Sequence, residues 1–95
     1  MKVFTVNGGD TIRLTAKDVS HADVGPITTG LTGSVSIVSM LTQQVVGGPV
    51  PITLHSGDDW YVDLISPATD GQYRIDMLIN YLTASRTLQL KLIVV

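Results

Sequence analysis

Apolar and polar residues alternate with a period of two along most of this chain. The clearest stretch covers residues 59–81, where two alternating runs flank the turn-forming sequence Pro-Ala-Thr-Asp-Gly. Successive side chains of a β-strand point to opposite faces, so this pattern predicts two strands that each carry one apolar face. The apolar series are Trp60, Val62 and Leu64 in the first run, and Tyr73, Ile75, Met77, Ile79 and Tyr81 in the second.

The same period predicts further strands on both sides of this pair. They cover Lys2 to Val6, Thr11 to Lys17, Ser34 to Leu41, Val50 to His55 and Thr87 to Val95. Residues 47–49, Gly-Gly-Pro, are expected to end the preceding strand. The lost alternation at Val38 predicts a β-bulge near that residue. Pro51 has no backbone N–H, which places its strand at a sheet edge. The first strand either forms a hairpin with the second or is an arm that pairs elsewhere.

Residues 18–30 show no sustained period and contain Pro26, so they are expected to form a long loop. With 95 residues, the chain has the size of one domain. We therefore expect a single domain over residues 1–95, with an N-terminal strand or arm and a turn over residues 1–9. Its roughly seven or eight short strands are typical of an antiparallel β-sandwich with Greek-key connections. A small β-barrel is the alternative fold.

Composition and charge narrow the classes of function. Charged residues make up 15% of the chain, against about 25% in an average domain. A surface with few charges associates readily, which favours a homo-oligomer or an assembly subunit over a monomer. The net charge of −2 and six scattered Lys and Arg residues argue against nucleic-acid binding, which needs a clustered basic patch. The chain has no cysteine, which excludes disulfides and thiolate metal sites.

Targeting signals are also not evident in the sequence. The N-terminal residues, MKVFTVNGGD, lack the apolar core of a signal peptide. No segment reaches the ~18 consecutive apolar residues that a membrane-spanning helix requires. We therefore expect a protein that is not secreted by a signal peptide and has no membrane partner.

Two polar segments contain residue types found in metal or catalytic sites. Asp18, His21 and Asp23 are suitable metal ligands, but calcium loops carry a denser Asp/Asn repeat and a closing Glu, and this chain has no Glu. A solvated loop is the better interpretation. His55 and Ser56 are followed by two aspartates, but no Gly-x-Ser-x-Gly elbow presents the serine, so these residues fit a turn.

Two outward-facing carboxylates, Asp63 and Asp76, lie on consecutive predicted strands. A glycosidase needs such a pair to face each other in a cleft, about 5–9 Å apart, and the pattern does not indicate one. We therefore expect no enzymatic activity, no cofactor and no metal. Of the aromatic residues, Trp60, Tyr73 and Tyr81 share the parity of aliphatic residues and are expected in the core. Tyr61 is expected to face outward.

Three segments resemble a known group of domains. The run Asp-Gly-Gln-Tyr at residues 70–73 resembles the tyrosine corner of immunoglobulin-like domains. Together with residues 31–37 and 59–62, it is similar to small immunoglobulin-like domains of tailed-bacteriophage structural proteins, over about residues 10–95. The chain departs from the antibody pattern because it has no cysteine pair and its tryptophan, Trp60, lies on a late strand. The resemblance implies a virion subunit that assembles in the host cytoplasm, in the tail, baseplate, head-to-tail region or capsid decoration.

These observations predict a non-enzymatic structural subunit that binds copies of itself or other virion proteins. The N-terminal strand, the loop at residues 18–30 and apolar residues on outward strand faces are the expected contacts. The interface residues expected are Val3, Phe4, Val6, Tyr61, Leu78, Leu82, Ile93 and Val95. The alternative is a carbohydrate- or host-receptor-binding module that uses loops at one end of the sandwich.

Overall fold

The computed structural model describes residues 2–95, and within that range the chain forms strands and no helix. The expected domain begins at Met1, which lies outside the described residues. The described chain accordingly offers no helix that could cross a membrane. The strands are β1 (Lys2–Val6), β2 (Thr11–Ala16), β3 (Ser20–His21), β4 (Gly25–Pro26), β5 (Thr32–Ser39), β6 (Val45–Pro51), β7 (Leu54–Ser56), β8 (Asp59–Ile65), β9 (Gly71–Tyr81) and β10 (Ala84–Val94).

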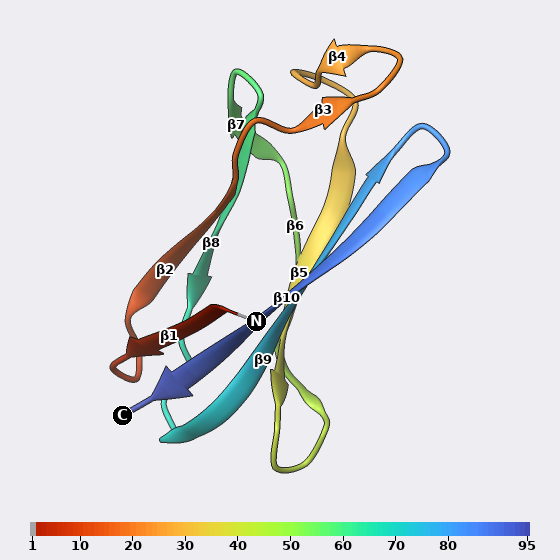
Figure 1. Ribbon diagram of the computed structural model, residues 1–95. Helices are drawn as coiled ribbons and strands as arrows, with labels where there is room; N and C mark the ends of the chain where they lie inside the picture. The colour runs from red at the N-terminus through yellow and green to blue at the C-terminus, as the bar shows by residue number, and fades with distance from the viewer. Residues whose placement is uncertain (1) are drawn as a thin grey trace.

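Two sheets face each other across the molecule (Figure 1). The five-stranded sheet has the order β1-β10-β9-β5-β6, and the three-stranded sheet has the order β2-β8-β7. Strands β3 and β4 pair separately at one end. No ladder joins the two main sheets within residues 2–95, so they do not close into a barrel. The arrangement is all-β, as expected, and is consistent with a β-sandwich.

One hydrophobic cluster fills the space between the two sheets. It includes Val35, Ile75, Leu92 and Val94 from the five-stranded sheet, and Leu14, Val62 and Leu64 from the three-stranded sheet. These residues come from the apolar parity of their strands, and burying them removes apolar surface from water, which is the main favourable term in folding. Trp60 and Tyr73 are also buried in this core, as their parity predicted, whereas Tyr81 is only half-buried at its margin.

The expectation of a purely antiparallel fold is wrong for one pair of strands. Strand β1 runs parallel to β10, with Phe4 beside Leu92 and Val6 beside Val94. The turn at residues 7–10 carries the chain from the five-stranded sheet to the three-stranded sheet, so β1 and β2 do not form a hairpin. Of the two alternatives, the first strand is therefore an arm that pairs elsewhere and not half of a hairpin. Alternation determines which face of a strand is apolar, but it does not determine the neighbouring strand.

Around β6, one expectation is wrong and a second is correct in position but not in strand. The Gly-Gly-Pro sequence does not break the strand, because β6 runs through it from Val45 to Pro51. The irregularity expected near Val38 is present as a register shift between Ile37 and Val38 in the β5–β6 pair. Its additional residues are in β6 and not in β5, because Val35 pairs with Val50 and Val38 with Val45. The same β5 residues pair with β9 without any shift. The predicted edge position of Pro51 is confirmed, since β6 is the last strand of its sheet.

Two strand boundaries differ from expectation as well. The strand expected over residues 50–55 is divided, because the chain leaves the five-stranded sheet after Pro51 and enters the three-stranded sheet at Leu54. Between them, Ile52 is buried and its N–H donates to the carbonyl of Gly33 at 3.0 Å. The last strand, expected to begin at Thr87, begins at Ala84 in the structure. The expected loop at residues 18–30 contains the short strands β3 and β4.

Candidate functional site

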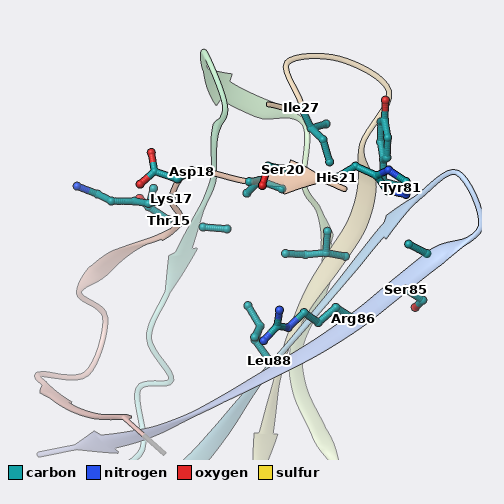
Figure 2. Close-up of a pocket in the computed structure, with 14 residues that line it drawn as sticks. Thr15, Lys17, Asp18, Ser20, His21, Ile27, Tyr81, Ser85, Arg86 and Leu88 are labelled. Atoms are coloured by element: carbon teal, nitrogen blue, oxygen red, sulfur yellow. The ribbon is translucent and has the colours of Figure 1, made fainter. Parts of the chain in front are cut away.

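A groove of about 650 Å³ lies at the end of the molecule where β3 lies. One wall belongs to the hairpin of β9 and β10, and the other is formed by residues 15–21 and Ile27. Figure 2 shows Arg86 and Leu88 extending from β10 into the space beneath the segment that carries Lys17 and Ser20. The groove is therefore a part of the gap between the sheets that the core does not fill.

The groove arises from a difference in strand length. Strands β9 and β10 have eleven residues each, whereas β2 has six and ends at Ala16. In the register of the β9–β10 pair, Ala84, Arg86 and Leu88 face the same side as the buried Leu92. Their part of β10 extends past the end of β2. As a result Leu88 remains 36% exposed although it faces inward.

The basic side chains of the groove are not matched by acidic partners. Arg86 and Lys17 line the groove and make no ion pair within residues 2–95. The one carboxylate of the lining, Asp18, lies within 4.8 Å of the carboxylates of Asp58 and Asp59. At the other end, the rings of His21 and Tyr81 pack together, with centroids 5.6 Å apart (Figure 2). The groove thus combines an apolar floor with a guanidinium group that has no protein partner in the described chain.

The backbone of β10 is also unpaired along the groove. Within residues 2–95, strand β1 pairs with residues 90–94 of β10, and residues 84–89 have a described strand neighbour on one side only. The N–H of Val95 donates to the carbonyl of Val6 at 3.0 Å, which shows that odd-numbered residues of β10 direct their backbone groups toward the β1 side. The N–H and C=O groups of Ser85 and Thr87 therefore point to the free edge, and both residues are exposed.

Four of the eight expected interface residues lie together at the edge formed by β1. We define the β1 edge surface as Val3, Phe4, Ile93 and Val95. Val3 is 53% exposed, Phe4 39% and Val95 59%, while Ile93 is half-buried. Val3 and Ile93 are on the outer face of neighbouring strands, and Phe4 is on the inner face at the edge. Val6, the other expected residue of this strand, packs against the core.

The remaining expected interface residues are not part of that surface. Leu78 and Leu82 lie near the turn of the β9–β10 hairpin and are 38% and 72% exposed. Tyr61 is on the outer face of the three-stranded sheet, where the guanidinium of Arg13 lies 4.4 Å from the centre of its ring. The structure therefore places one of the eight residues, Val6, against the core and separates the other seven into three places.

The polar residues considered as metal ligands are not gathered as their spacing suggested. His21 accepts a hydrogen bond from the N–H of Asp23 through Nδ1 at 3.2 Å, and Asp18 lies away from both, next to Asp58 and Asp59. Within that cluster, Asp59 accepts a hydrogen bond from the N–H of Asp18 at 2.9 Å. This contact is a structural one, since it holds the loop that follows β2 against the start of β8.

The other catalytic combinations are likewise taken up by local contacts. The Nδ1 atom of His55 lies 3.1 Å from the carbonyl oxygen of Gly57, and its ring stacks on Trp60 with centroids 4.4 Å apart. Asp63 and Asp76 belong to different sheets and form ion pairs of 2.8 Å with Arg13 and Arg74, respectively. The two carboxylates therefore do not face one another across a cleft.

The ion pair on the three-stranded sheet has a defined electrostatic effect. Arg13 donates two hydrogen bonds to Asp63, at 2.8 and 3.0 Å. These hydrogen bonds, with the charge of the guanidinium, lower the pKa of Asp63 below its ordinary value, against a smaller opposing effect of burial. Asp63 is thus stabilised as a carboxylate, which suits a structural ion pair and not a proton donor.

Sequence reasoning did not identify Arg86 and Leu88 as residues of a site. The alternating pattern predicts the last strand only from Thr87, so Arg86 falls outside it and Leu88 belongs to its ordinary apolar face. Their parity was visible, because Arg86 continues the series of Leu88, Leu90 and Leu92 toward the N-terminus of the strand. A charged residue in an inward series is the signal that identifies this position.

Comparisons of the chain with family models, curated proteins and solved structures find no match.

Proposed function

We propose that this protein is a non-enzymatic structural subunit that assembles with copies of itself and with neighbouring proteins through unpaired strand edges. The observation that carries the proposal is the β1 edge surface. Strand β1 is the outermost strand of its sheet, and its outer edge has no partner within residues 2–95. Val3 and Phe4 are exposed on it. An unpaired strand with exposed apolar side chains readily pairs with another chain.

The two edges of the five-stranded sheet differ in a way that supports this proposal. The edge at β6 contains Pro49 and Pro51, and its register with β5 shifts twice. Prolines and bulges are devices that prevent a sheet edge from pairing with other strands. Strand β1 has neither device, and only Lys2 at its start carries a charge. One edge is therefore protected against association and the other is open to it.

An immunoglobulin-like sandwich is the finer fold that we propose. The hydroxyl of Tyr73, near the start of β9, donates to the carbonyl of Thr69 at 2.7 Å, the geometry of a tyrosine corner. The set β2-β8-β7 facing β10-β9-β5-β6 also fits the two layers of that fold. With the resemblance to domains of tailed-bacteriophage structural proteins, this supports a virion subunit that assembles in the host cytoplasm.

Sedimentation velocity tests the proposed function. We expect the average mass of the wild-type protein to rise with concentration, and Val3→Lys to remain monomeric because a charge on the edge opposes pairing. Leu41→Lys is the matched control, since Leu41 is 92% exposed in the turn between β5 and β6 and should leave association unchanged. A wild-type protein that stays monomeric at millimolar concentration would contradict self-assembly.

A further inference from the structure

We propose that the groove between the β9–β10 hairpin and residues 15–21 is a docking site for an extended strand of another protein. That strand carries an acidic residue and an apolar residue two positions apart. The inference rests on the proposed assembly function and specifies the kind of segment that the subunit receives. Its binding would add a strand beside residues 84–89 of β10, in line with β1, which already occupies the same edge at residues 90–94.

The backbone of β10 provides the first part of the complementarity. Ser85 and Thr87 direct their N–H and C=O groups toward the free edge, where no described strand accepts or donates to them. An added strand would form the same kind of ladder with these groups that β1 forms further along. Such pairing requires a partner segment that is extended and not helical.

The side chains provide the second part. A partner strand places residues two apart on one face, directly opposite Arg86 and Leu88. Arg86 has no ion pair in the described chain, so a carboxylate opposite it gains a charged partner at no cost to an existing pair. Leu88 is 36% exposed and lines the groove with Ile79 and Tyr81, so an apolar side chain opposite it removes apolar surface from water.

The positive charge of Arg86 argues against a second copy of the β10 edge as the occupant. Two β10 edges related by a two-fold axis would pair antiparallel, with equivalent faces on the same side. Pairing centred on Thr87 would make the two Arg86 side chains diagonal neighbours, and pairing centred on Arg86 would place them directly opposite. Like charges in these positions are destabilising. The occupant is therefore a strand with its own carboxylate.

Peptide titration followed by NMR tests this site. The probe is the peptide Ac-Thr-Val-Thr-Asp-Thr-Val-Thr-NH2, whose inward residues read the same in both strand directions. The comparison peptide has Lys in place of Asp. We expect the Asp peptide to shift the amide signals of Ser85 and Thr87 and to bind about five-fold more tightly than the Lys peptide. Equal binding of both peptides, or shifts confined to other surfaces, would overturn the proposal.

Three variants identify the contacts. Arg86→Glu should reverse the preference, so that the Lys peptide binds more tightly. Thr87→Pro should abolish binding of both peptides, because it removes an N–H that points to the free edge and not to β9. Lys91→Glu is the control for charge on the opposite face of the same strand, and it should keep the wild-type preference. If Thr87→Pro does not fold, the peptide preference of Arg86→Glu still tests the proposal.

The outcome is separable from that of the proposed function. A protein that self-associates in sedimentation but binds neither peptide refutes the docking site and leaves self-assembly intact. A protein that prefers the Asp peptide but stays monomeric supports the docking site and contradicts self-assembly.

Discussion

At the residue scale, one buried and one partly buried hydrogen bond fix aromatic side chains against loops that connect the strands. The hydroxyl of Tyr73 donates to Thr69 in the connection between β8 and β9, and the indole N–H of Trp60 donates to Ile27 in the segment before β5. The sequence predicted that both rings would be buried, because they share the parity of aliphatic neighbours. It did not predict the acceptor of Trp60, since a backbone carbonyl in a loop carries no sequence signal.

The bond made by Tyr73 leads to a stability prediction. Tyr73→Phe keeps the ring in the core but leaves the carbonyl of Thr69 without this donor, which should lower the free energy of unfolding by about 1 kcal/mol. Urea unfolding measures the change. Tyr61→Phe is the control, because this ring is on the outer face of the three-stranded sheet, and we expect a change below about 0.5 kcal/mol. Equal effects of the two substitutions would exclude a structural role of the Tyr73 hydroxyl.

The ion pair of Arg13 and Asp63 predicts a dependence of stability on pH. The pKa of Asp63 is lower in the folded protein than its ordinary value of 3.8, so the pair stabilises the fold above that value. The contribution is lost as the pH falls through the lower, folded-state pKa. The melting temperature of Asp63→Asn should therefore lie below that of the wild type at neutral pH and approach it in acid.

A partner substitution is the control for this pH effect. Arg13→Gln removes the group that lowers the pKa of Asp63. In a protein that carries Arg13→Gln, adding Asp63→Asn should therefore cause a smaller pH-dependent difference in melting temperature. A gap between Asp63→Asn and the wild type that stays constant across the acid range would contradict the assignment.

At the element scale, alternation predicted the inward face of most strands but not their neighbours or their interruptions. The parallel pairing of β1 with β10 depends on contacts between residues far apart in the sequence. Strand β6 was expected to break at residues 47–49 because Gly-Gly-Pro is typical of turns. An edge strand accommodates this sequence, since only one side of it must pair and register shifts absorb the additional residues.

A close approach of β5 and β9 gives a prediction at this scale. A Cβ atom on Gly33 would collide with the backbone carbonyl oxygen of Leu78. Gly33→Ala must therefore displace one strand from the other, and we expect a loss of more than about 2 kcal/mol in chemical unfolding. In Gly47→Ala the new Cβ would lie 3.4 Å from Cδ1 of Ile37, an ordinary contact. That control should change stability by less than about 1 kcal/mol.

At the scale of the whole molecule, the candidate site results from sheets of unequal length and from edges of unequal protection. Alternation predicts the last strand from Thr87, three residues later than β10 begins, and this prediction leaves Arg86 outside the strand. The groove depends on how far β10 extends past β2, which only the packed sheets reveal. The exposure of Val3 was expected from its strand, but its separation from Leu78 and Tyr61 follows from the strand order.

The central claim is that β1 is the strand through which copies of the subunit associate. Its even-numbered residues bond to β10, since Val6 accepts from Val95, so the N–H groups of Val3 and Thr5 point outward. Hydrogen exchange of these two amides, measured by NMR at low and high protein concentration, tests the claim most directly. We predict that both exchange rapidly in the monomer and become protected as the mass increases. Rapid exchange of both amides in a sample that has clearly associated would contradict it.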